Sequence, residues 1–166
     1  AIYGRTVNNG QSCVASKRFI VVEEVADEFL LKFKEKMSAL KLGDPMNLET
    51  QLGPLSSEDA LITILKQVEK AVSQGAKIEV GGKKADLQGN FMQATIISNI
   101  TPEMDLYKEE LFGPVASFYK VKNEEEAIKV ANATDFGLGG SVFSKNIERA
   151  KNVANQIDSG MIFINH

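Results

Sequence analysis

The stretch RFIVVEEVADEFLLKFKEKMSAL, residues 18–40, joins a short apolar run to an amphipathic one. Residues 18–22 are rich in β-branched and aromatic side chains, which predicts a strand. Large apolar residues in 25–40 then recur at spacings of four, four and three, which predicts one apolar face of a helix. They are Phe29, Phe33, Met37 and Leu40. A strand followed by a helix in this way suggests an α/β domain.

The same alternation continues along the chain. Helices are predicted over 57–74 and 146–158, and a third begins after Asn123, with Glu126 placed three positions on as in a capping box. Further strands are predicted at 77–80, 91–97, 116–121, 140–144 and 161–165. Because several strands are continuously apolar, the pattern predicts one α/β domain over 1–166, with a largely parallel sheet flanked by helices.

The composition argues against several classes of protein. The chain carries 19 Lys and Arg against 22 Asp and Glu, a net charge of -3, so it shows no basic surface for nucleic acid or an anionic membrane. No uninterrupted apolar run approaches the roughly 18 residues that a membrane span needs. The single cysteine cannot form an internal disulfide, which is typical of a reducing compartment and predicts a cytoplasmic protein.

That cysteine, Cys13, lies in NNGQSCVASKR, residues 8–18. A lone cysteine is most often a small buried apolar residue. Here the turn-forming NNG precedes it, and SCVAS (12–16) is a candidate first turn of a helix, where free N–H groups and the helix dipole stabilise a thiolate. The same N–H groups could stabilise an oxyanion on a bound substrate. Cys13 is therefore a candidate nucleophile.

A cysteine nucleophile usually needs a base. The only histidine, His166, is the last residue, so a cysteine–histidine hydrolase would depend on it alone. One cysteine and one histidine do not make a metal-ligand set, so no metal site is expected. There is no GxxxxGK[ST] loop, and GLGG at 137–140 lacks the spacing of a dinucleotide fingerprint. The residues alone leave two interpretations, an enzyme with an activated thiol and a non-catalytic α/β module.

Six motifs resemble those of the aldehyde dehydrogenase family, in the family's order and over almost the whole chain. The segment around Cys13 is similar to the catalytic cysteine segment N-x-G-Q-x-C, and EELFGPV (109–115) is similar to the signature E-E-x-F-G-P-V. The other four are LGPLSS (52–57), QGAKIEVGG (74–82), ANATDFGLGGSVFS (131–144) and SGMIFIN (159–165). On these motifs the chain is identified as the catalytic domain of a family member.

The resemblance implies a role for each motif residue. Cys13 would attack the aldehyde carbon to form a thiohemiacetal, hydride would leave to NAD or NADP, and water would hydrolyse the resulting thioester. The Cys13 N–H would be half of the oxyanion hole, Glu110 would hold the nicotinamide ribose hydroxyls, and Phe112 would pack beside the nicotinamide. Ser12 and Val14 would face the aldehyde. Without the resemblance, Glu110 would be interpreted as a surface carboxylate and Phe112 as core.

The resemblance also implies partners outside these residues. The family's nucleotide-binding domain, general-base glutamate and oxyanion asparagine precede the cysteine, and its oligomerisation segment follows the last motif; none is found here. We therefore expect this chain by itself to be inactive, and the full-length enzyme to be a homo-oligomer, a dimer or a tetramer. Asn165 is expected to be structural, near the cysteine loop.

The cysteine segment and ITPEMDLYKEELFGPVA (100–116) look most like those of bacterial succinate-semialdehyde dehydrogenases. Some members of that group carry a second cysteine two positions after the nucleophile as a redox switch. That position is Ala15 here, so no such switch is expected. Two alternatives stay open, a different aldehyde substrate and a non-catalytic scaffold of the same fold.

Overall fold

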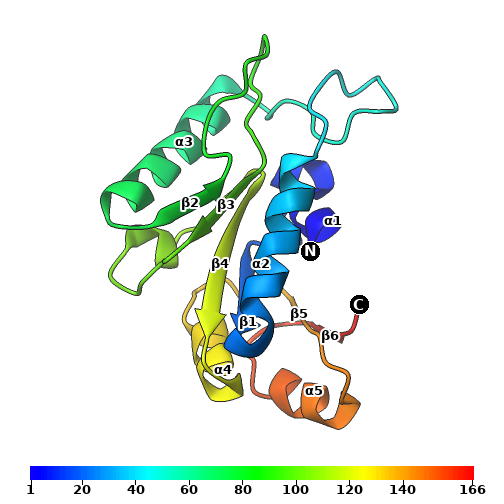
Figure 1. The fold of residues 1–166 in the computed structure, drawn as a ribbon, viewed down its shortest axis with the longest axis vertical. Helices are drawn as coiled ribbons and strands as arrows, with labels where there is room; N and C mark the ends of the chain where they lie inside the picture. Colours follow the sequence, from blue (N-terminus) through cyan, green and yellow to red (C-terminus); the bar gives the residue numbers. More distant parts are fainter.

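The computed structural model describes all 166 residues, and its centre is a four-stranded sheet (Figure 1). The strands are β1 (Arg18–Val22), β4 (Val115–Val121), β3 (Thr95–Ser98) and β2 (Lys77–Val80), in the order β1-β4-β3-β2. β4 runs parallel to both β1 and β3, whereas the edge strand β2 is antiparallel to β3. The largely parallel sheet predicted from the sequence is confirmed.

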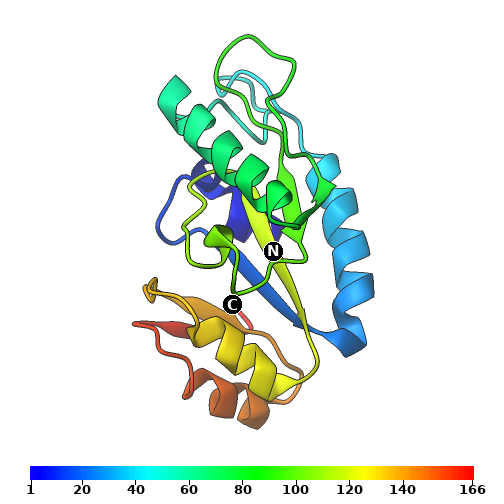
Figure 2. The same cartoon turned by 90° about the vertical axis from the view of Figure 1, so that its left-hand side faces the viewer.

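Helices cover both faces of this sheet, with α2 (Glu23–Ser38) and α3 (Glu58–Ser73) on opposite sides (Figures 1 and 2). Ile96 and Ile97 are adjacent on β3 and both are fully buried. Successive strand residues point to opposite faces, so Ile96 packs in the core that contains α2 side chains and Ile97 in the core that contains α3 side chains. Burial on both faces explains why the strands read as continuous apolar runs.

A second, smaller layer lies at the lower end of the molecule in both views (Figures 1 and 2). It holds a two-stranded parallel sheet of β5 (Gly140–Val142) and β6 (Ile162–Ile164), joined through α5 (Ile147–Ala154). α4 (Glu124–Asn132) connects it to β4 and packs on β1 and β4. These two strands do not join the main sheet.

The predicted helix starts agree with the side-chain caps. Asn123 Oδ1 accepts from the Glu126 N–H at 3.0 Å, and Glu126 Oε2 accepts from the Lys122 N–H at 2.7 Å, which closes the start of α4. Ser57 caps α3 in the same way, by accepting from the Ala60 N–H. None of the helices is both long and apolar enough to cross a bilayer.

Two predicted elements differ from the structure by more than two residues at one end. The run at 91–97 is extended only from Thr95 onward, and Met92 pairs with Lys84 through a single isolated bridge. Phe91 and Met92 are nevertheless buried, so their apolar character reflects a loop packed on the core rather than a strand. The helix predicted over 146–158 ends at Ala154.

Candidate active site

Cys13 lies in a turn, so the prediction that it starts a helix was wrong. Asn8, Asn9 and Gly10 precede the turn, and all three have left-handed φ values, of 48°, 56° and 76°. Asparagine and glycine tolerate this region best, which is why NNG can reverse the chain. The turn itself is closed by the Ala15 N–H, which donates to Ser12 O at 3.1 Å.

A helix cannot continue from this turn because the next residues are bonded elsewhere. The Ser16 N–H donates to Gly4 O at 2.7 Å, in α1 (Ile2–Thr6), and β1 begins two residues later at Arg18. An α-helix would need that N–H to bond four residues back along its own segment. Cys13 therefore has no helix dipole behind it, and its chemistry depends on side chains that contact the turn.

Gly10 is the last residue of the 3-10 helix η1 (Val7–Gly10). At Gly10 the cysteine segment packs closely against the segment that enters β4. A Cβ at this position would lie 2.1 Å from Gly113 O, closer than any real contact. Arg5, fully buried beneath, donates from Nη2 to Gly10 O at 2.6 Å. The close approach and the positive φ both require glycine at position 10.

Asn9 and Gln11 attach the cysteine segment to the loop before α3. Asn9 Oδ1 accepts from the Gly53 N–H at 2.8 Å, and its Nδ2 donates to Pro54 O at 3.1 Å. Gln11 Oε1 accepts from the Ser56 N–H at 2.8 Å. The NNGQ and LGPLSS motifs, 45 residues apart in the chain, thus hold each other in place.

Glu110 and Phe112 lie beside the cysteine turn because of the parallel sheet. β1 and β4 are parallel neighbours, so the segments that lead into them, including Cys13 and Glu110, meet at one edge. Between Glu110 and Phe112, Leu111 is buried in the core, which leaves the two flanking side chains turned outward. The Phe112 ring is 46% exposed, so the alternative that Phe112 is simple core is wrong.

Lys17 joins the two segments and was not among the residues predicted for the site. Its Nζ donates to Ser12 O at 2.8 Å and to Cys13 O at 3.1 Å. It also forms an ion pair with Glu110 Oε1 at 2.8 Å and lies 5.6 Å from the centre of the Phe112 ring. The only sequence signal was a basic residue after the cysteine motif, since the contacts arise from the turn and the sheet register.

The exposure of the cysteine turn suits a reacting group. Cys13 is exposed and its thiol makes no hydrogen bond. Val14 is 67% exposed and Ser12 is half-buried, whereas Ala15 packs inward. Ser12 and Val14, the residues predicted to face the aldehyde, therefore flank an exposed sulfur. The side chain that points inward is the methyl group of Ala15.

A buried cation underlies the same region. Arg5 has a pKa lowered to about 10, because burial disfavours its charged form while the negative charge of Glu110 opposes that effect. The group is thus still a cation at neutral pH. Its Nε and Nη1 atoms are buried without a hydrogen-bond partner. Arg5 and Lys17 together place two positive charges around the Glu110 carboxylate.

The other candidate residues lie apart from the turn. The His166 ring packs 5.8 Å from the Phe163 ring, and no hydrogen bond joins it to Cys13, so the structure gives a cysteine–histidine pair no support. Asn165 forms two 2.9 Å hydrogen bonds with the Ser144 backbone, which connects the ends of β5 and β6, but none with the cysteine segment. No group of three or more His, Cys, Asp or Glu side chains is arranged to hold a metal ion.

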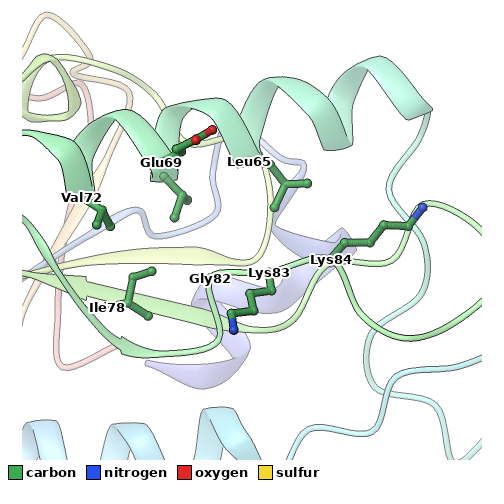
Figure 3. Close-up of a pocket in the computed structure, with 8 residues that line it drawn as sticks. Leu65, Glu69, Val72, Ile78, Gly82, Lys83 and Lys84 are labelled. Carbon is green, nitrogen blue, oxygen red and sulfur yellow. The ribbon is translucent and has the colours of Figure 1, made fainter.

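Two hollows of the surface are lined by residues other than Cys13. One lies between α3 and β2 (Figure 3). It is lined by Leu65, Val68, Glu69, Val72, Ile78, Gly82, Lys83 and Lys84. Another is lined by Phe143, Ser144, Lys145 and Asn165. The candidate site is an exposed turn with Lys17, Glu110 and Phe112 beside it, and it lies outside both of these hollows.

Comparison with known proteins agrees with the motifs. The model of the aldehyde dehydrogenase family matches residues 1–166. A protein of Deinococcus radiodurans named succinate-semialdehyde dehydrogenase [NADP(+)] is 46% identical over 166 residues, which are 100% of this chain and 35% of that protein. The chain thus spans about a third of the length of the curated relatives it matches.

Solved structures agree as well. Succinic semialdehyde dehydrogenase from Streptococcus pyogenes, in complex with NADP+, has a TM-score of 0.95 and 46% identity, and the match covers 99% of this chain and 36% of that one. Betaine aldehyde dehydrogenase from Staphylococcus aureus, in complex with NAD+, also has a TM-score of 0.95, at 35% identity, with coverage of 99% and 34%. The likeness therefore extends over nearly every element described above.

Proposed function

This chain belongs to the aldehyde dehydrogenase family, and from that premise we propose that residues 1–166 are the catalytic-cysteine domain of an enzyme that oxidises an aldehyde to a carboxylic acid. Cys13 is the nucleophile, since it is an exposed thiol in a turn that three other segments hold in place: α1, the loop before α3 and the segment that enters β4. The single observation that carries the proposal is the meeting of Cys13, Glu110 and Phe112 around Lys17.

Both the sulfur and the backbone N–H of Cys13 take part in the proposed reaction. When the sulfur attacks the aldehyde carbon, the carbonyl oxygen gains negative charge and becomes the oxyanion of a thiohemiacetal. The Cys13 N–H makes no hydrogen bond in the structure, so it is free to donate to that oxyanion. Ser12 and Val14 flank the sulfur and contact the rest of the aldehyde. Once the substrate carbon has lost its hydride, the acyl group is held as a thioester on Cys13, and water hydrolyses this thioester to release the acid and free the thiol.

The residues beside Cys13 fit a nicotinamide cofactor. Glu110 Oε1 is paired with Lys17, but Oε2 accepts no hydrogen bond, so the carboxylate can hold the two hydroxyls of a ribose. The exposed Phe112 ring offers an apolar wall for the nicotinamide and keeps water from the reacting atoms. When bound, the cofactor supplies the acceptor for the hydride that leaves the substrate carbon.

For the substrate we propose succinate semialdehyde, with NADP as the cofactor. The support is the name of the Deinococcus radiodurans relative and the NADP+ complex of the Streptococcus pyogenes structure. The Staphylococcus aureus structure, named for betaine aldehyde and holding NAD+, makes a different aldehyde and NAD the alternatives to test. We propose a cytoplasmic location, since an exposed lone thiol suits a reducing compartment. A homo-oligomer as the working form is proposed from the family resemblance alone.

The test is formation of NADPH by the complete protein that contains this chain. We expect turnover of succinate semialdehyde with NADP, and less with betaine aldehyde or with NAD. Cys13→Ser should lower kcat at least a thousandfold, because an unactivated hydroxyl is a far weaker nucleophile than a thiolate.

The control is Leu48→Ala, at a fully exposed position, which should turn over as the wild type does. Retention of activity by Cys13→Ser would contradict the role of Cys13. A folded wild-type protein that oxidises neither aldehyde with either cofactor would favour the non-catalytic scaffold.

A further inference from the structure

The Lys17 side chain contacts both halves of the site, the cysteine turn and the segment that carries Glu110 and Phe112. Its ammonium group makes two hydrogen bonds to the carbonyl oxygens of Ser12 and Cys13 and an ion pair with Glu110. The side chain is only 16% exposed, so these contacts are largely shielded from water. Two carbonyls and one carboxylate are an acceptor set well suited to a compact ammonium group with three rotatable donors.

The contact with the Ser12 carbonyl determines where the Cys13 N–H points. Both groups belong to one planar peptide unit, and the chain contains no cis peptide bonds. In a trans peptide the C=O and the N–H point in opposite directions. Because the Ser12 oxygen is held toward Lys17, the Cys13 N–H is directed away from Lys17, to the side on which it has no protein partner.

The contact with Glu110 orients the other half of the site. Lys17 holds Oε1 at 2.8 Å and leaves Oε2 free. The same ammonium group lies 5.6 Å from the Phe112 ring centre, within the range of a cation–π attraction. One cation thus sets the direction of the oxyanion donor, the carboxylate and the ring relative to each other.

We propose that Lys17 is a positioning residue that couples the cysteine turn to the cofactor-binding segment. It rests on the proposed function and deepens it. Lys17 touches neither the aldehyde nor the cofactor. It keeps the Cys13 N–H aligned with the oxyanion and keeps Glu110 in place for the ribose hydroxyls. Removing its charge lets the turn rotate its peptide units and lets Glu110 swing into solvent.

The experiment measures each half separately in the complete protein. Acylation of Cys13 by p-nitrophenyl acetate without nucleotide reports on the turn alone. In that reaction the sulfur bonds to the acetyl carbon, p-nitrophenolate leaves and the thiol proton passes to solvent.

Oxidation of the aldehyde at varied NADP concentrations reports on Glu110 through the KM for NADP. Lys17→Met keeps the length of the side chain and removes its charge. We expect acylation to fall about tenfold or more, and KM for NADP to rise severalfold.

Two further variants make the outcome specific. Lys32→Met removes an exposed lysine paired with Glu28 in α2, and should change neither quantity. Lys17→Arg keeps the charge but presents a planar fork of donors, so KM for NADP should stay near the wild-type value while acylation remains slower. This variant tests the proposal even if Lys17→Met fails to fold.

Failure of the proposal differs from failure of the proposed function. If wild-type protein oxidises aldehydes and a folded Lys17 variant matches it in both acylation and KM, Lys17 positions nothing and the proposal is wrong. If the wild type acylates Cys13 but oxidises no aldehyde, the proposed function fails, and the acylation rates still decide the role of Lys17 in the turn.

Discussion

At the scale of single residues, Gly10 is the residue of the cysteine segment with little freedom to change. Its φ of 76° belongs to a region that other residues avoid, and a Cβ would meet Gly113 O at 2.1 Å. The oxygen is part of the backbone that leads into β4, so it cannot move aside without moving that strand entry. Gly10 therefore sets the separation between the cysteine turn and Glu110.

Gly10→Ala should be both less stable and less active. Backbone strain at this φ costs about 1–3 kcal/mol, and the clash with Gly113 adds to it. Thermal unfolding should show a lowered Tm, and acylation of Cys13 should slow because the turn is displaced.

The matched control is Gly139→Ala, where the added Cβ would make only ordinary contacts, at 3.4 and 3.9 Å from Met161. It should behave as the wild type does. A Gly10→Ala protein with unchanged Tm and acylation would show that the turn is not held by this close approach.

Some residues of the site could be predicted from the sequence, whereas Lys17 could be recognised only in the structure. Cys13, Glu110 and Phe112 lie in local motifs, so a resemblance to the family was enough to single them out. Their roles in catalysis remain predictions. Lys17 lies between a turn and a strand, and its three contacts depend on which way the turn folds and on which strand pairs with β1. No periodicity or spacing in the sequence encodes either fact.

At the scale of elements, Glu79 connects the edge strand β2 to its neighbours. Its side chain is only 5% exposed, and it accepts from Lys34 of α2 at 2.9 Å and from Ser98 of β3 at 2.7 Å. Lys77 lies 2.9 Å away as an ion pair. Burial alone would raise the pKa of Glu79, but these contacts outweigh it and lower the pKa to about 2.

The lowered pKa makes stability depend on pH in a defined direction. Glu79 prefers to be ionised in the folded chain, so its contribution is complete above its ordinary value of 4.5 and is lost as the pH falls toward about 2. At roughly 1.4 kcal/mol per pKa unit, the fall from 4.5 to about 2 contributes on the order of 3 kcal/mol at neutral pH.

Glu79→Gln should therefore lower the free energy of unfolding at pH 7 and flatten its pH dependence between about 2 and 4.5. Urea unfolding at a series of pH values measures both effects. Glu49→Gln removes an exposed carboxylate paired with Lys41 and serves as the control, with little change expected. Equal pH slopes for wild type and Glu79→Gln would contradict this account.

Among the elements, capped helices were predicted well and the cysteine helix was not. The starts of α3 and α4 are encoded by Ser57 and Asn123, whose side chains bond within their own helices. SCVAS has the composition of a helix start, but the Ser16 N–H bonds to Gly4 across the site. A tertiary contact overrode the local preference.

At the scale of the whole molecule, two apolar cores lie on opposite faces of one sheet. Ile96 belongs to the core with Phe33 and Met37 of α2, and Ile97 to the core with Ile64 and Val68 of α3. Both isoleucines are fully buried, although they are neighbours in the chain. The sheet therefore depends on both helical layers for its stability.

Ile96→Ala and Ile97→Ala should each lower the free energy of unfolding by about 2–5 kcal/mol, because each leaves a cavity in a filled core. Guanidinium unfolding of the two variants gives the values. Ile62→Ala, at a 40% exposed position of α3, should cost much less. A large loss for one isoleucine and none for its neighbour would mean that only one face of the sheet is packed.

Fold class, family and the identity of the motif residues were predictable from the amino-acid sequence, because they depend on apolar periodicity, capping side chains and local motifs. The three-dimensional structure was needed to see that Cys13 lies in a turn, that Lys17 joins it to Glu110, and that β5 and β6 form a sheet of their own. These features depend on strand pairing and on contacts between distant segments. A pattern read along the chain reports which residues prefer to be buried, but not which segments then meet.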